Sequence, residues 1–192
     1  MFEILRKLML AKELIMEEGH ITVLGQHFVM QPPIIWITLQ KELEKKNMEH
    51  LIYSVSKEAS KTWLLGLKKH KHMSANDLLN WSMYTISFAG WGKARIVNYD
   101  KENKRMIVHT RDSIFAKAYG KSKIPTDYVI RGFLAGAGSV CFNDDLDCVE
   151  TKCISSGSHV CEFIVKRAEK FEDSKLVKEQ LPFLFQNKRK RR

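Results

Sequence analysis

A glutamate and two cysteines, Glu150, Cys153 and Cys161, fall within twelve residues of the sequence. The loop between the cysteines is centred on Gly157 and holds three serines, which predicts a tight turn joining two antiparallel strands. If the strands pair symmetrically about Gly157, the cysteine Cβ atoms lie opposite each other, about 4.5–5.5 Å apart. That spacing suits two thiolates on one zinc ion, and with slightly closer strands it suits a disulfide. This part of the chain is therefore expected to be a hairpin, with both chemistries open.

The position of Glu150, three residues before Cys153, limits how the two side chains share an ion. Residues three apart in a regular strand face opposite sides, so the strand must bulge or end between them. A fourth ligand must come from elsewhere. Asp127 also fits the first turn of a helix, where the dipole favours a carboxylate. Free cysteines are usually small buried hydrophobes and loop histidines usually have no metal role. The candidates for the fourth ligand are Asp127, Cys141, Cys148 and His159.

Hydrophobic periodicity predicts helices first and paired strands later. Strand pairs are expected within residues 20–30, between 93–99 and 105–110, and between 146–153 and 160–166. In the long helix 49–71 we expect Leu51, Ile52, Val55, Ala59, Trp63 and Leu67 to face inward. The sequence thus predicts an α+β domain in which helices cover an antiparallel sheet. The helices are expected at 2–17, 32–46, 49–71, 77–88, 125–142 and 174–181.

The helix expected at 125–142 contains three glycines, Gly132, Gly136 and Gly138. Glycine costs up to about 1 kcal/mol relative to alanine inside a helix, so their clustering predicts a very close backbone approach to the sheet. The spacing does not fit a phosphate-binding loop of either common type. A packing role is therefore favoured over nucleotide binding.

Several aromatic residues concentrate in the middle of the chain. Trp81, Tyr84 and Phe88 share one helix face at i, i+3 and i+7, and Trp91 and Phe133 lie nearby in the expected fold. Ordinary core packing explains such a set. The alternative is one wall of an apolar pocket for a flat or hydrocarbon ligand. No Ser-His-Asp, H-E-x-x-H or nucleotide-binding pattern accompanies it, which favours a binding module over an enzyme.

Composition and charge restrict the cellular setting. The chain has 192 residues, 44% apolar, without the roughly 18 uninterrupted apolar residues of a membrane span. Its first residues lack the pattern of a signal peptide, so we expect a cytoplasmic protein without membrane insertion, whose cysteines stay reduced. The net charge is +10, and half of it comes from Lys188–Arg192. Such a tail binds nucleic acid only nonspecifically.

Several of these segments together resemble the 4-vinyl reductase domain family. They are Arg131–Gly136, Val149–Ile154 with Gly157, Cys161–Phe163, Trp91–Arg95 and Ile107–Ser113. The resemblance implies the fold of haem–NO-binding and TRAPP proteins, with helices packed on a four-stranded antiparallel sheet, and extends to the sensor domains of aromatic-responsive activators. In those relatives three cysteines and a glutamate hold a zinc. Glu150, Cys153 and Cys161 match three of the ligands, and Asp127 stands where the remaining cysteine is expected.

The leading hypothesis is a small-molecule sensor with a structural zinc. The zinc is expected to join the last hairpin to helix 125–142, and an apolar or aromatic ligand to lie beside Trp81, Tyr84, Phe88, Trp91 and Phe133. We expect residues 1–48 to form a homodimer surface, 49–168 the ligand-binding core, and 169–192 a C-terminal helix with its basic tail. The alternatives are a 4-vinyl reductase or accessory factor acting on a tetrapyrrole, and a nucleic-acid-binding or scaffold protein.

Overall fold

Antiparallel strands form two sheets in the computed structural model, which describes residue 6 and residues 8–182. The smaller sheet joins β1 (Leu14–Glu17), β2 (His20–Val23) and β3 (Gln26–His27). The larger has the order β4-β5-β7-β6, from β4 (Lys93–Asp100), β5 (Arg105–Arg111), β7 (Cys161–Lys166) and β6 (Asp147–Lys152). The helices are α2 (Pro33–Glu44), α3 (His50–Lys71), α4 (Ala75–Phe88), α5 (Ile114–Tyr119), α6 (Tyr128–Phe142) and α7 (Lys175–Gln180).

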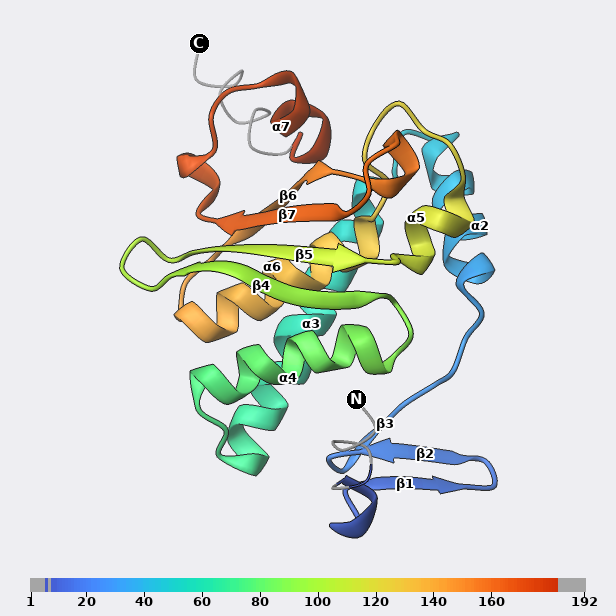
Figure 1. The fold of residues 1–192 in the computed structure, drawn as a ribbon, viewed down its shortest axis with the longest axis vertical. Coiled ribbons are helices and arrows are strands. Elements are labelled where there is room, and N and C mark those ends of the chain that lie inside the picture. Colours follow the sequence, from blue (N-terminus) through green and yellow to red (C-terminus); the bar gives the residue numbers. More distant parts are fainter. Residues whose placement is uncertain (1–5, 7, 183–192) are drawn as a thin grey trace.

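The two sheets occupy different places in the molecule (Figure 1). The larger sheet is antiparallel throughout, which confirms the predicted α+β class with a four-stranded sheet. The smaller sheet lies at one end, near α4 and the C-terminal end of α3 (Figure 1). No helix in the described part of the chain is long and apolar enough to span a membrane.

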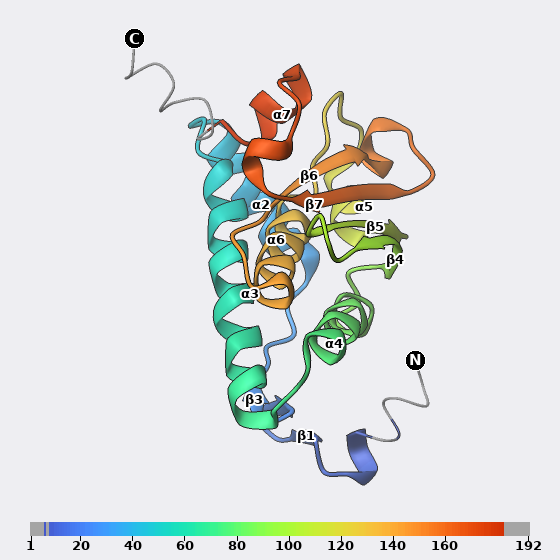
Figure 2. The same ribbon diagram turned by 90° about the vertical axis from the view of Figure 1, so that its left-hand side faces the viewer.

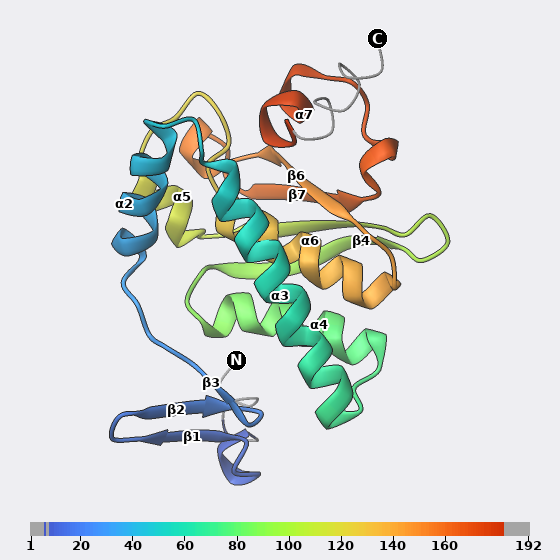
Figure 3. The same cartoon turned by 180° about the vertical axis from the view of Figure 1, so that it is seen from behind.

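The larger sheet carries its main helices on one face. Helix α6 packs against β6 and β7, and α3 packs on the far side of α6, so that three layers follow one another (Figures 2 and 3). Burial alternates along β5 and β7, as expected for strands with one buried face. The inward side chains of these strands, including Met106, Val108, Phe163 and Val165, pack beneath α6 and form the centre of the core.

Helix α6 is buried along its whole length, and its glycines explain how it fits between two layers. A Cβ at Gly136 would lie 2.7 Å from the Cβ of Ser60 and closer still to the carbonyl of Lys57. Gly132 meets α3 in the same way, whereas Gly138 faces Val165 on the sheet. The predicted approach to the sheet is therefore correct for Gly138 alone, and the other two glycines allow α3 to approach.

The buried face of α3 differs from the predicted one because its neighbour is a glycine-lined helix. Small polar side chains form the contact: Ser56 Oγ donates to the carbonyl of Val129 at 2.7 Å, and Ser60 Oγ to that of Phe133 at 2.9 Å. Ile52 and Leu67 are buried as predicted, but Val55 is 64% exposed. The inward stripe is therefore rotated toward the serines.

The helices at 32–46, 49–71, 77–88, 125–142 and 174–181 are confirmed with small shifts at their ends. The prediction of a helix over 2–17 is wrong at its C-terminal end, where Leu14–Glu17 forms β1 and pairs with β2. The region 20–30 does form a strand pair, and β1 extends it to three strands. Helix α5 was not predicted; it is short and begins at Ser113, whose side chain accepts from the backbone N–H of Ala116. The start of the helix expected from residue 2 and the basic tail at 188–192 lie outside the described residues.

Candidate metal centre and aromatic cluster

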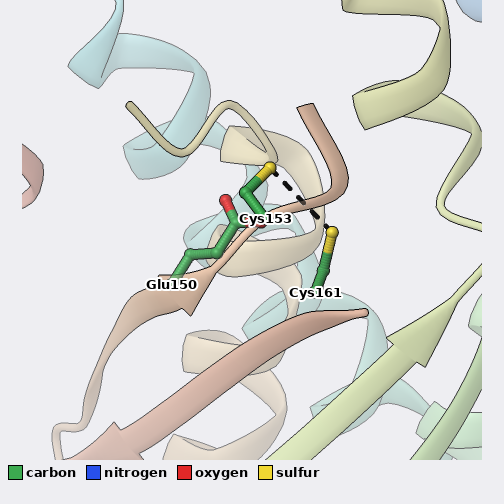
Figure 4. Close-up of side chains that lie close together, drawn as sticks. All are labelled: Glu150, Cys153 and Cys161. Carbon is green, nitrogen blue, oxygen red and sulfur yellow. Dashed lines mark hydrogen bonds between the residues drawn. The ribbon is translucent and has the colours of Figure 1, made fainter. Parts of the chain in front are cut away.

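The hairpin β6–β7 brings Glu150, Cys153 and Cys161 together. The strand register pairs Glu150 with Phe163 and Lys152 with Glu162, so one extra residue bulges out between them. The bulge is the irregularity that the three-residue spacing required, and it turns Cys153 toward the side occupied by Glu150 (Figure 4). The two sulfurs lie 4.0 Å apart, and both cysteines are free thiols.

Three potential metal ligands converge at this point. One carboxylate oxygen of Glu150 and the sulfurs of Cys153 and Cys161 all lie within 4.8 Å of one another, and all three residues are buried. Glu150 Oε2 accepts from the backbone N–H of Asp127 at 3.0 Å, whereas its buried Oε1 has no partner among the described residues. Two sulfurs and a free carboxylate oxygen are ligands that zinc prefers, so the donor set fits the ion that the resemblance implies.

Asp127 lies beside these three residues, at the N-cap of α6. Its Oδ2 accepts a hydrogen bond from Ser113 Oγ at 2.6 Å, while its buried Oδ1 has no partner in the described part of the chain. A second unpartnered oxygen therefore lies next to the first. The three other candidates, Cys141, Cys148 and His159, do not join the described cluster: the cysteines are buried elsewhere and the histidine is exposed.

Burial concentrates acidic groups here. The pKa of Glu150 is raised well above its usual value, first by burial and then by repulsion from Asp127 and Cys153. Burial likewise raises the pKa of Asp127 to about 7. The pKa of Cys153 is lowered to about 4, chiefly because Cys161 donates to its sulfur, and that of Cys161 is raised. Such a cluster retains protons or binds a cation, because buried unpaired anions are costly.

A second set of residues, not predicted from the sequence, supports Glu150 from the C-terminal helix. The side-chain amide of Gln180 accepts from the backbone N–H of Glu150 and donates to its carbonyl, both at 2.8 Å. Arg131, itself 2% exposed, donates to Gln180 Oε1 at 2.6 Å. Its guanidinium lies between the rings of Tyr53 and Tyr128. Gln180 thus bonds the free edge of β6 at the candidate ligand, as a neighbouring strand would.

The centre lies next to the surface on one side. A cavity of about 320 Å³ reaches Cys153 and opens between the β6–β7 loop and the segment before α6. Its lining includes Lys123, Pro125, Lys152 and Leu176. An ion therefore has a short route to the sulfurs without unfolding of the core.

The predicted ligand-binding residues lie in two groups. Phe133 stands at the middle of an aromatic cluster, with Trp91 at 5.5 Å and Trp63 at 6.2 Å between ring centroids. Phe88 joins it through Phe28, at 6.5 Å. Trp81 is buried on α4, whereas Tyr84 is 46% exposed.

Two members of this cluster were missed by the sequence reasoning. Phe28 comes from the segment after β3 and contacts Trp63 at 5.9 Å; Phe115 comes from α5 and contacts Trp91 at 5.6 Å. No local pattern marks either residue. The indole N–H of Trp63 is buried in the described structure and has no hydrogen-bond partner there. The cluster therefore contains an apolar surface with one unused donor.

Comparison with known proteins identifies part of the chain. The model of the 4-vinyl reductase domain family matches residues 106–167, which confirms the resemblance noted in the sequence for this segment. The phenol-responsive sensory domain of the transcription activator PoxR, solved with phenol, superposes with a TM-score of 0.74 at 18% identity, covering 92% of this chain and 94% of that one. This likeness establishes a shared fold over almost the whole chain.

Two further solved structures overlap less completely. A vinyl-4-reductase family protein from Methanocaldococcus jannaschii gives a TM-score of 0.48 at 18% identity, over 69% of this chain and 76% of that chain. A trafficking protein particle complex subunit 3 from Naegleria fowleri, covalently bound to palmitic acid, gives 0.47 at 12% identity, over 70% and 93%. No curated protein sequence matches the chain.

Proposed function

We propose, from the premise that residues 106–167 form a 4-vinyl reductase domain, that this chain is a small-molecule sensor domain. Its ligand is an apolar or aromatic compound with one polar acceptor, bound at the aromatic cluster around Phe133. The family match and the fold shared with a phenol-responsive domain support a sensing role. The observation that carries the ligand class is the buried indole N–H of Trp63, unpartnered in the described structure, among aromatic rings. A reductase reaction remains a prediction of the family name.

The physical case for such a ligand rests on the cost of an unused donor. A buried donor without a partner costs about 1–3 kcal/mol, and a bound hydroxyl or carbonyl oxygen removes that cost. The rings supply an apolar surface for the rest of the molecule. A phenol-like compound meets both requirements, whereas a pure hydrocarbon meets only the second.

Calorimetric titration with phenol and toluene tests this proposal. We expect phenol to bind about tenfold more tightly than toluene, and Trp63→Phe to abolish that difference while keeping toluene binding. Trp36→Phe, on α2 and outside the cluster, serves as the control and should retain the preference. Equal affinities for the two compounds, or a preference that survives Trp63→Phe, would contradict the assignment of the indole N–H.

We also propose a structural zinc held by Glu150, Cys153, Cys161 and Asp127. The support is the convergence of the first three and the two oxygens without partners in the described structure, Glu150 Oε1 and Asp127 Oδ1. When bound, zinc supplies a crosslink between the last hairpin and the start of α6. With four protein ligands the site is closed, which fits a structural role.

Elemental analysis of protein purified without chelators tests the zinc proposal. We expect about one zinc per chain, and its loss in Cys161→Ser. Cys141→Ser, at the other end of α6, is the matched control and should keep the metal. Cobalt substitution adds a spectroscopic readout, because thiolate ligation gives an intense near-ultraviolet band. Protein without zinc that carries a Cys153–Cys161 crosslink would replace the metal site with a disulfide.

We further propose that the sensor is cytoplasmic and forms a homodimer through its N-terminal region. Exposed apolar side chains are concentrated there, which marks an interaction surface. Ile35→Glu on α2 should convert the dimer to a monomer in sedimentation analysis. A parent protein that is monomeric at micromolar concentration would contradict this. The exposed set is Ile15, Met16, Val29, Met30, Ile34, Ile35 and Leu39.

A further inference from the structure

The larger sheet has an outer face over β4, β5 and β7 that no described helix covers. Figure 1 looks onto this face, and Figure 2 shows α3 and α6 together on the opposite side. The strand register and the alternation of burial place Lys93, Arg95, Arg105, His109, Arg111 and Lys166 outward. We call these six residues the basic face.

The cations of the basic face lie next to one another and not next to acids. Lys93 pairs directly with Arg111 across the strands, and Arg95 with His109. Directly opposed like charges destabilise a sheet. Among the described residues, the side chains of Arg95 and Arg111 make no hydrogen bond or ion pair. This face therefore carries positive charge that the fold does not require.

The acids near this face are already engaged. Glu162, which faces outward on β7, accepts from Thr151 and pairs with His109 and Lys152. Asp112 pairs with Lys117 and Lys93 at one end of the face. Neither acid neutralises Arg95 or Arg111, so complementary carboxylates have to come from another molecule.

We infer that the basic face docks an acidic segment of a partner protein, with acidic side chains placed against Arg95 and Arg111 and an aliphatic side chain on Ile107 and Ile164. These two isoleucines form a directly opposed, half-exposed pair in the middle of the face. An apolar centre with a charged rim is the arrangement of protein interfaces. Rim charges of this kind guide association and fix orientation.

Other occupants fit this face less well. A second copy of the chain would bring like charge to the same surface, and residues 183–192 contain no acid. A uniform polyanion would meet the carboxylate of Glu162 near the centre of the face. Single-stranded nucleic acid needs outward aromatic rings to stack on, but Tyr99 of β4 stacks against Phe142. A membrane surface needs more apolar area than two isoleucines.

Fluorescence anisotropy with a labelled peptide that alternates glutamate and isoleucine tests the inference on the full chain. We expect saturable binding that weakens as NaCl rises from about 50 to about 500 mM. The double variant Arg95→Glu, Arg111→Glu should bind at least about tenfold more weakly. The matched control Lys69→Glu, Lys121→Glu makes the same change in net charge elsewhere and should bind like the parent.

Two further probes separate the other partners. A peptide with lysine in place of glutamate should not bind, and oligothymidine and vesicles containing phosphatidylserine should bind more weakly than the acidic peptide. The inference is overturned if the acidic peptide shows no saturable binding. It is also overturned if oligothymidine or the vesicles bind more tightly, or if the control loses as much affinity as the Arg95, Arg111 variant. Circular dichroism of each variant checks that the fold is retained.

Discussion

Replacing Gly136 by alanine is expected to push two layers of the fold apart. The new Cβ would lie 2.7 Å from the Cβ of Ser60, whereas carbon atoms in contact lie about 3.5–4.0 Å apart. Helix α3 must then move outward by about 1 Å. Such a shift lengthens the bond from Ser60 Oγ to the Phe133 carbonyl from 2.9 Å beyond hydrogen-bonding distance.

The expected loss of stability follows from three contributions. Overpacking costs about 1–3 kcal/mol, and a buried serine hydroxyl and carbonyl left unpaired cost about 1–3 kcal/mol more. Alanine gains up to about 1 kcal/mol in helix propensity. The net expectation is a loss of about 2–4 kcal/mol, or about 5–15 °C in Tm for a chain of this length.

Gly66 provides a matched control on α3. A Cβ there would meet only Nε2 of Gln26, the mobile end of a long side chain, at 3.0 Å. Gly66→Ala should therefore be neutral or stabilise by up to about 1 kcal/mol. Urea denaturation followed by circular dichroism measures both variants. The close packing of α3 on α6 is refuted if Gly136→Ala is as stable as the parent or as Gly66→Ala.

Two further predictions concern the C-terminal part of the chain. Gln180→Leu leaves the backbone N–H and carbonyl of Glu150 unpaired, so hydrogen exchange at that N–H should accelerate by at least about tenfold, and unchanged exchange would contradict the contact. Lys104 and Arg167 hold the pKa of Asp144 at about 2, below its ordinary 3.8. The resulting stabilisation is present above the ordinary pKa and is lost as pH falls toward 2. Asp144→Asn should therefore lose less stability than the parent over that interval in acid titration followed by fluorescence, and equal losses would contradict the ion pairs.

The sequence was sufficient for the hairpin because its constraints are local. The spacing of Glu150 and Cys153 required an irregular strand, and the spacing of Cys153 and Cys161 about Gly157 placed the sulfurs opposite each other. Whether a metal binds there stays a prediction. Gln180 could not have been assigned in advance, because its contact with Glu150 spans thirty residues and leaves no periodic signal.

Predictions about helix faces failed where a neighbouring helix changed the packing rule. Hydrophobic periodicity placed Val55 inward, yet the glycines of α6 expose a backbone surface that Ser56 and Ser60 contact by hydrogen bonds. The strand at Leu14–Glu17 was missed because its partner strand, not its own pattern, determines its conformation. Both failures arise from tertiary contacts that the local sequence pattern does not encode.

The extra residue in β6 makes the candidate metal centre depend on how many residues separate its ligands. Deleting Thr151 would remove the bulge and leave Glu150 and Cys153 two positions apart in a regular strand, where both side chains still share one face. Deleting Thr151 and Lys152 together would make the two ligands adjacent and send them to opposite faces. The shorter deletion should therefore keep the shared site and the longer one destroy it, although both leave every ligand in the chain.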